Sequence, residues 1–174
     1  MLASSDGQST MARKRKGEPS CMVIYETVCY VIDGKRLLMI KRAEGLFGAG
    51  KWSGLGGKIE AGESKEQACV REVYEESGLH VDDLKYHGSL GFMFENTEES
   101  IVVFVFSTMS FKGVLAESPE GVLRWIGFDE IPYDEMWDDS RYWLPLLIGG
   151  KDFNGEFHFD REVSKVLDYK LETL

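Results

Sequence analysis

Three glutamates in one short stretch have the types and spacing that metal-assisted chemistry requires. Glu72, Glu75 and Glu76 lie in the segment REVYEES at residues 71–77. Residues three and four positions apart lie on one face of a helix, so the three carboxylates would share a small patch. Carboxylates this close raise one another's pKa and weaken the helix, and a bound cation would offset both effects.

A hard divalent cation is the natural occupant of such a patch. Mg²⁺ is usually held by one or two carboxylates together with waters and substrate phosphates. Arg71 precedes Glu75 by four residues, a spacing that lets it orient Glu75 through a charge-assisted hydrogen bond. The competing interpretation is a solvated acidic helix face, because Glu is a good helix former. Local composition alone favours that simpler interpretation.

The residues around the glutamates carry the start and stop signals of a helix. Ser64 and Gln67 have the spacing of a capping box, and Gly78 can end a helix in the left-handed conformation that glycine tolerates. We therefore expect a helix from Ser64 to Ser77. A glycine-rich loop at residues 54–57 precedes it.

The complete spacing of residues 57–79, GKIEAGESKEQACVREVYEESGL, resembles the Nudix box. The fixed positions are Gly57, Glu63 and the run from Arg71 to Leu79, and the chain departs from the pattern at none of them. This resemblance outweighs the solvated-face interpretation. It implies hydrolysis of a nucleoside diphosphate linked to another group, with Mg²⁺ or Mn²⁺ bound by the glutamates of the box.

The resemblance also implies roles for individual residues. Glu72 and Glu76 would be metal ligands, Glu75 would lie near the same ions, and the loop would add the backbone carbonyl of Gly56. We expect Glu63 to brace the loop. A further acid outside the box should join the metal site or act as the general base. The implied catalytic and metal-binding residues are Gly56, Arg71, Glu72, Glu75, Glu76 and, as the candidate outside the box, Glu120, for which an exposed loop position is the alternative.

The elements that must position these groups can be read from the hydrophobic pattern. Strands are expected at 22–32, 37–41, 85–95, 101–109, 122–128, 153–159 and 165–171, and helices at 64–77, 129–136 and 139–148. Residues 52–58 are expected to form a short strand followed by a glycine turn. Alternation places Leu90, Phe92 and Phe94 on one face of their strand. The predicted fold class is α+β, a Nudix-type α/β/α sandwich with a mixed β-sheet between helices.

Composition limits the partners. The chain has 174 residues and a net charge of −10, which argues against nucleic acid as a partner, since phosphate contacts need Lys and Arg. No apolar run is long enough for a membrane span. Cys21, Cys29 and Cys69 have no metal-ligand spacing and are expected to be reduced core thiols in a cytoplasmic protein. The protein is expected to be a monomer or a homodimer. Residues 1–20, with the basic run Arg13 to Lys16, are expected to form a flexible arm ahead of a domain at 21–174.

Outside the box, the likeness narrows to the 8-oxo-dGTP diphosphatases of animals, a group within the Nudix family. It rests on residues 47–58, 130–133, 136–137, 142–147, 153–159 and 167–169, and it covers about 27–174. This resemblance implies conversion of an oxidised purine nucleoside triphosphate to the monophosphate and pyrophosphate, as in nucleotide-pool sanitation. The implied substrate-binding residues are Thr27, Lys41, Phe47, Ser53, Phe92, Trp137 and Asp139.

In that assignment Trp137 stacks on the purine, Phe47 and Phe92 wall the pocket, and Thr27 and Lys41 line its floor and mouth. An ordinary core position is the alternative for Trp137, and it is the preferred interpretation for the tryptophan at 143.

Two positions depart from the group. Asp139 matches one of two adjacent acids that recognise the base, but the second falls on Ser140 unless the register slips to use Asp138. The pocket asparagine of the group falls on Ser53, whose hydroxyl cannot offer both an amide donor and a carbonyl. The missing pocket amide leaves open a Nudix pyrophosphatase for another linked nucleotide such as ADP-ribose. A non-catalytic nucleotide-sensing domain is the third hypothesis; loss of a box glutamate would favour it, but all of them are present.

Overall fold

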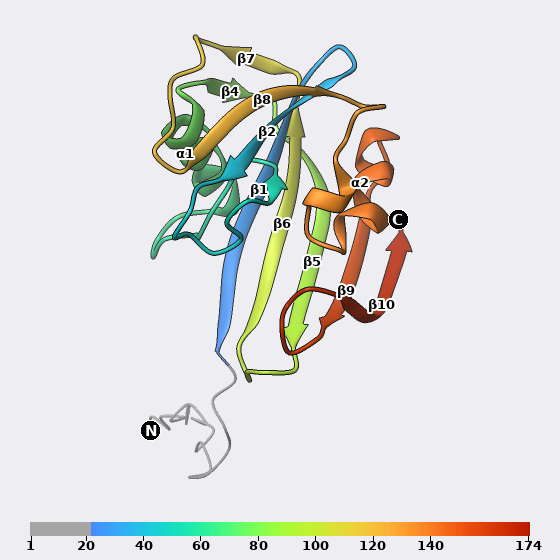
Figure 1. The fold of residues 1–174 in the computed structure, drawn as a ribbon. Coiled ribbons are helices and arrows are strands. Elements are labelled where there is room, and N and C mark those ends of the chain that lie inside the picture. The colour runs from blue at the N-terminus through green and yellow to red at the C-terminus, as the bar shows by residue number, and fades with distance from the viewer. Residues whose placement is uncertain (1–21) are drawn as a thin grey trace, which may run out of the picture.

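A mixed sheet lies at the centre of the fold, which the computed structural model describes for residues 22–174 (Figure 1). The proposed arm at 1–20, with Arg13 to Lys16, and Cys21 lie outside the described residues. The main sheet consists of β1 (Val23–Asp33), β2 (Arg36–Arg42), β3 (Trp52–Ser53), β5 (Lys85–Phe94), β6 (Ser100–Thr108), β8 (Gly121–Gly127), β9 (Phe153–Phe159) and β10 (Val166–Thr173). The helices are α1 (Lys65–Ser77), the 3₁₀ turn η1 (Tyr133–Glu135) and α2 (Ser140–Ile148).

The strand order explains why the sheet is mixed. It runs β10-β9-β5-β6-β1-β2-β3, and β8 also pairs with β2. The β1–β6 and β5–β9 pairs are parallel, and the other pairs are antiparallel. The α+β class with a mixed sheet is therefore confirmed.

Alternation along β1 builds one core on each face of the sheet. Cys29 and Val31 face α1, where they pack with Cys69 and Val73, whereas Tyr30 faces α2 and packs with its side chains. Each helix thus covers one face, as the sandwich requires (Figure 1). Both described cysteines are buried and free, as expected of core thiols.

Helix α1 begins and ends as its sequence indicates. The Ser64 hydroxyl accepts a hydrogen bond from the Gln67 amide at 3.1 Å, and the Gln67 side chain accepts one from the Ser64 amide at 2.9 Å. Gly78 ends the helix with φ of 74°. The capping box fixes the first turn, so the direction in which the glutamates project is set by local sequence.

One expected helix is shorter than predicted, and two strands were not predicted. The helix expected at 129–136 is reduced to the three residues of η1, because Pro132 disfavours a helical conformation in the residue before it. The short strand expected at the start of 52–58 is β3, and the glycine turn follows it. Strands β4 (His80–Asp82) and β7 (Ser110–Lys112) were not expected and form a separate two-stranded sheet. They have three residues each, too few for a pattern to be seen.

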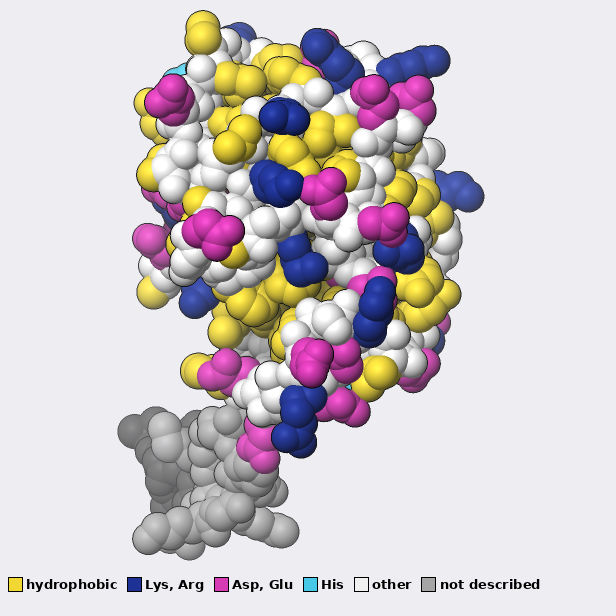
Figure 2. All heavy atoms as spheres, in the orientation of Figure 1, with side chains coloured by type: hydrophobic (Ala, Val, Ile, Leu, Met, Phe, Trp, Pro, Cys, Tyr) yellow, Lys and Arg dark blue, Asp and Glu magenta, His cyan; other side chains and the backbone are white. Residues whose placement is uncertain are grey.

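The surface carries both signs of charge. In the face shown in Figure 2, acidic and basic side chains are interspersed, with hydrophobic side chains between them. The net charge of −10 is therefore not gathered into one acidic field on this face. No helix in residues 22–174 is long and apolar enough to cross a membrane.

Candidate active site

Glu76 is the most tightly held carboxylate of the helix. Its side chain is fully buried, one oxygen accepts a hydrogen bond from the Gly56 amide at 2.8 Å, and the other lies 3.0 Å from Nη1 of Arg42. Burial raises the pKa of Glu76 to about 8, even though Arg42 and the Gly56 amide both favour its charged form. The contacts fix Glu76 against the glycine loop.

Arg42, at the end of β2, joins Glu76 to a second acid. Its Nη1 also donates a hydrogen bond to Glu120, and its Nη2 approaches the Gly56 carbonyl at 3.4 Å. Glu120 is thus brought to the helix carboxylates from the loop before β8, as the sequence predicts. Arg42 was not predicted, because its partners lie 34 and 78 positions away along the chain.

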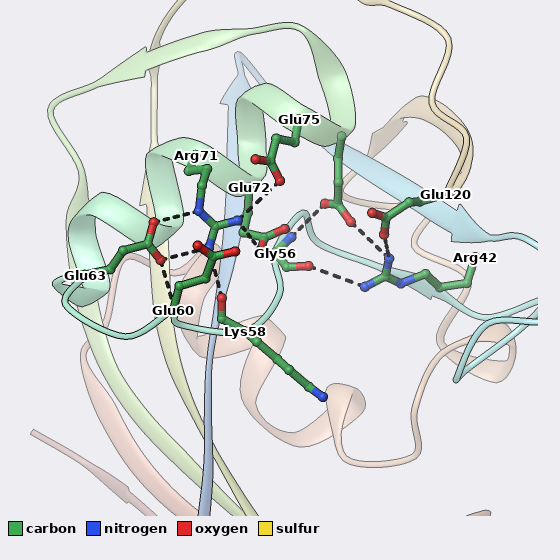
Figure 3. A network of polar contacts seen from close by, with 10 residues as sticks. Arg42, Gly56, Lys58, Glu60, Glu63, Arg71, Glu72, Glu75 and Glu120 are labelled. Atoms are coloured by element: carbon green, nitrogen blue, oxygen red, sulfur yellow. Dashed lines mark hydrogen bonds and ion pairs between the residues drawn. The ribbon is translucent and has the colours of Figure 1, made fainter.

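Arg71 organises the other carboxylates (Figure 3). Its Nη1 lies 2.7 Å from a Glu72 oxygen and 3.2 Å from a Glu75 oxygen. Its Nε and Nη2 donate hydrogen bonds to the two Glu63 carboxylate oxygens at 2.6 and 2.9 Å. Nη2 also donates to the Lys58 carbonyl at 3.0 Å. The expected contact between Arg71 and Glu75 is therefore present.

Glu63 holds the loop and not the helix carboxylates. One of its oxygens accepts a hydrogen bond from the Glu60 amide at 3.0 Å, in addition to the two from Arg71. Arg71 and the Glu60 amide lower the pKa of Glu63 to about 2. Its geometry agrees with the bracing role that the sequence suggests.

Gly57 leaves room for Glu72. A Cβ built at Gly57 would lie 2.7 Å from the Glu72 carboxyl group, so a larger residue would displace it. Burial raises the pKa of Glu72, while Arg71 opposes the shift. The glycine loop therefore lies directly against both Glu72 and Glu76.

These residues fit a divalent cation by the chemistry of their donors. The donor set consists of carboxylate oxygens and the Gly56 carbonyl, which are the ligands that Mg²⁺ prefers. The arginines already lie between pairs of these acids: Arg42 between Glu76 and Glu120, and Arg71 between Glu72 and Glu75. No group of three or more acidic, histidine or cysteine side chains within residues 22–174 is already arranged around a common point. In this structure the acids are therefore paired with the two arginines.

A cavity of about 170 Å³ opens beside this network. Six of the seven predicted substrate-binding residues line it: Thr27, Phe47, Ser53, Phe92, Trp137 and Asp139. The Thr27 hydroxyl is buried and has no hydrogen-bond partner among the described residues. The cavity therefore combines aromatic walls with an unsatisfied polar group, a combination typical of small-molecule sites.

The tryptophan at 137 is part of the cavity wall and not of the core. Its ring stacks on Phe47 with centroids 5.1 Å apart, and the Lys51 ammonium lies 5.0 Å from its centroid. Trp143, by contrast, is 4% exposed and packs in the core, as the sequence suggests.

The contacts of Asp138 and Asp139 show which of these two acids lines the cavity. Asp139 is buried, lines the cavity and accepts a hydrogen bond from Nε1 of Trp143 at 2.7 Å. Asp138 accepts a hydrogen bond from the Val166 amide at 3.0 Å and is absent from the lining. Ser140 lines the cavity beside Asp139, and Asp138 does not, so the second acid of the related group corresponds in position to Ser140.

Lys41 does not line the cavity, contrary to expectation. Its Nζ lies 2.6 Å from Glu135 and 5.7 Å from the centroid of the Trp52 ring. Neighbouring side chains on a strand point to opposite faces. Because Arg42 points to the carboxylates, Lys41 must point away from them.

The buried carboxylate of Asp139 predicts a pH dependence of stability. Burial raises its pKa to about 6, while the Trp143 hydrogen bond opposes the shift. Between the unfolded pKa and 6 the folded state binds more protons, so stability falls as pH rises. Between pH 4 and 7, the free energy of unfolding of the wild type should fall by on the order of 2 kcal/mol relative to that of Asp139→Asn. Urea unfolding of both proteins across this range measures the difference, and parallel curves would contradict it.

Comparisons with known proteins agree with this geometry. The NUDIX domain profile matches residues 24–147. The oxidized purine nucleoside triphosphate hydrolase of Mus musculus is 39% identical over 145 residues, which cover 83% of this chain and 92% of the relative. The protein of the same name from Danio rerio is 40% identical over 146 residues, covering 84% and 92%. The crystal structure of a MutT protein from Bacillus halodurans superposes with a TM-score of 0.77 at 26% identity, covering 86% of this chain and 97% of that one.

Proposed function

The chain belongs to the Nudix family, and from this premise we propose that it hydrolyses an oxidised purine nucleoside triphosphate such as 8-oxo-dGTP to the monophosphate and pyrophosphate. The two vertebrate relatives, which match over nearly their whole length, carry names that describe this substrate class. The role would be sanitation of the nucleotide pool, which protects DNA from oxidised precursors.

One observation carries the proposal: the aromatic cavity adjoins the arginine and glutamate network. Arg42 and Gly56 belong to the cavity lining and also contact Glu76. A purine held between the cavity walls would therefore direct its phosphates toward Glu72, Glu76 and Glu120. The arrangement suits a substrate with a flat base at one end and a polyphosphate at the other.

We propose Mg²⁺, or Mn²⁺ in its place, as the ion of this site. Glu72, Glu76 and the Gly56 carbonyl would hold it, with Glu75 near the same ions. When bound, a divalent cation neutralises phosphate charge and lowers the pKa of water. This matters on a chain of net charge −10, which would otherwise repel a triphosphate.

Two side chains of the network, Arg71 and Glu120, have further proposed roles in the reaction. Arg71 keeps Glu72 and Glu75 aligned through its contacts at 2.7 and 3.2 Å. Glu120, whose side chain is partly exposed and reaches the network from a loop, is the proposed general base. It would accept a proton from the attacking water as that oxygen bonds to phosphorus and the anhydride P–O bond breaks, releasing pyrophosphate.

Recognition of the base is proposed to use Asp139 and Ser140 at the cavity wall. Ser53 donates its hydroxyl proton to the Gly54 carbonyl at 3.0 Å and so offers the base mainly an acceptor. A short hydroxyl gives less discrimination than an amide with both donor and acceptor atoms. We therefore expect modest selectivity among oxidised purines.

Trp137 supplies a testable part of this binding mode. Replacing it with Ala should raise KM roughly 5- to 150-fold through loss of base stacking, with little change in kcat. Trp137→Phe, which retains an aromatic face, should have a KM between those of the wild type and Trp137→Ala. Steady-state kinetics with 8-oxo-dGTP measures both constants, and an unchanged KM in the Ala variant would exclude stacking on Trp137.

A substrate panel tests the proposed function. Initial rates would be compared for 8-oxo-dGTP, 2-hydroxy-dATP, dGTP and ADP-ribose at equal Mg²⁺, with products separated by chromatography. We expect the oxidised triphosphates to give the highest kcat/KM, with the monophosphate and pyrophosphate as products. Negligible turnover of every purine triphosphate would reject the proposal, and rapid cleavage of ADP-ribose alone would replace it with a linked-nucleotide pyrophosphatase.

The proposed partner is a free nucleotide and not nucleic acid, and the proposed location is the cytoplasm. The buried free thiols of Cys29 and Cys69 support a reducing compartment.

A further inference from the structure

The aromatic cavity adjoins a second, more open groove of about 570 Å³. The groove is lined by residues of the phosphate end of the site, among them Gly57, Lys58 and Glu120. Six residues line both spaces: Glu26, Arg42, Phe47, Phe94, Ile101 and Val163. These six residues form the junction between the cavity and the groove.

Only two of the junction residues are polar, and one of them is already engaged. Arg42 contacts Glu76, Glu120 and the Gly56 carbonyl. The Glu26 carboxylate has no hydrogen bond or ion pair with any of residues 22–174. Among the described residues at the junction, Glu26 is therefore the one whose polar side chain is free to bind a ligand.

The backbone holds Glu26 firmly in this place. It lies within β1, opposite Val103 of β6, and forms an antiparallel bridge with Lys58 on its other side. Burial raises the pKa of Glu26, and the positive charges of Lys58 and Arg42 oppose the shift. Glu26 is half-buried, so its carboxylate keeps some contact with solvent and remains accessible to a hydrogen-bonding ligand in the cavity or the groove.

The proposed substrate determines which of its groups reaches the junction. In a nucleoside triphosphate, the sugar connects the base to the phosphates. With the base in the cavity and the phosphates in the groove, the sugar hydroxyls must lie at the junction. A carboxylate is an acceptor well suited to sugar hydroxyls, and acidic residues bind the ribose 2′-hydroxyl in dinucleotide sites.

Building on the proposed function, we infer that Glu26 is a specificity-determining residue that accepts hydrogen bonds from the sugar hydroxyls of the nucleotide. A ribose presents two adjacent hydroxyls to the two carboxylate oxygens, whereas a deoxyribose presents one. The chain should therefore accept oxidised ribonucleoside triphosphates, and should favour them over the matched deoxyribonucleotides.

The test compares 8-oxo-GTP with 8-oxo-dGTP in the wild type and in Glu26→Gln, which keeps the size of the side chain and removes its charge. The measured quantity is the ratio of kcat/KM for the ribo and deoxy substrates. We expect this ratio to exceed one in the wild type and to fall about tenfold in the variant, the effect of one charged hydrogen bond. Glu95→Gln, which removes an exposed charge outside the cavity and the groove, should leave the ratio unchanged.

A second measurement covers the case in which the variant loses turnover. Titration calorimetry with GMP and dGMP, with EDTA present, reports sugar recognition without catalysis, and the melting temperature reports folding. Equal effects of Glu26→Gln on both sugars, in rate and in affinity, would overturn the inference and assign Glu26 to the positioning of Lys58. Failure of the wild type to hydrolyse any purine triphosphate would instead reject the proposed function, and the calorimetric comparison would still decide the role of Glu26.

Discussion

Replacing Glu76 with Gln should lower kcat on the order of 10³-fold while leaving the fold intact. Gln has the size of Glu and can still accept the hydrogen bond from the Gly56 amide, so the loop should remain in place. The variant lacks the negative charge that the proposed ion requires. Because the position is buried and no neighbouring acid occupies it, no other group can supply that charge.

Glu66→Gln provides the matched control for this experiment. Glu66 lies in the first turn of the same helix, its side chain is 52% exposed, and its only ion pair within residues 22–174 is a 4.0 Å contact with Lys65. This variant should retain wild-type turnover. A Glu76→Gln enzyme that works at nearly the wild-type rate would show that Glu76 is not a ligand.

Replacing Arg71 with Lys should have the second largest effect, with loss of both activity and stability. The guanidinium contacts Glu63, Glu72, Glu75 and the Lys58 carbonyl at once, and an ammonium group cannot reproduce this fork of donors. The Arg71 side chain is 23% exposed and that of Glu63 is 19% exposed, so the contacts between these two side chains are largely shielded from solvent. We expect about 2 kcal/mol of lost stability.

The activity of Arg71→Lys should fall on the order of 100-fold, because Glu72 and Glu75 lose the group that aligns them. Chemical denaturation and steady-state kinetics measure the two effects separately. Arg161→Lys, an exposed substitution outside the network, should change neither. Wild-type kinetics together with wild-type stability in Arg71→Lys would show that the contacts in Figure 3 are incidental.

The parts of the site that follow from local sequence could be predicted. The capping box at Ser64, the left-handed Gly78 and the three- and four-residue spacing of the glutamates act over one or two helical turns. They fix the helix and the face that carries Glu72 and Glu76. The family resemblance supplied the link to the glycine loop, which the structure places 2.8 Å from Glu76.

The remaining parts depend on contacts between distant segments. Arg42 meets its partners only after β2, the loop before β8 and α1 have packed together, and no spacing along the chain indicates this. Lys41 was assigned to the pocket through the family resemblance, but on β2 its side chain points to the face opposite that of Arg42. Glu26 was overlooked because its importance comes from the junction that the folded chain creates around it.

The central claim is that the carboxylates of α1 hold a divalent cation, and Mn²⁺ binding tests it most directly. Titration of the nucleotide-free protein, followed by the electron paramagnetic resonance signal of free Mn²⁺, measures affinity independently of turnover. We expect saturable binding in the wild type and in Glu66→Gln, and at least about tenfold weaker binding in Glu76→Gln. Equal affinity in all three proteins, or no specific binding in the wild type, would contradict the account.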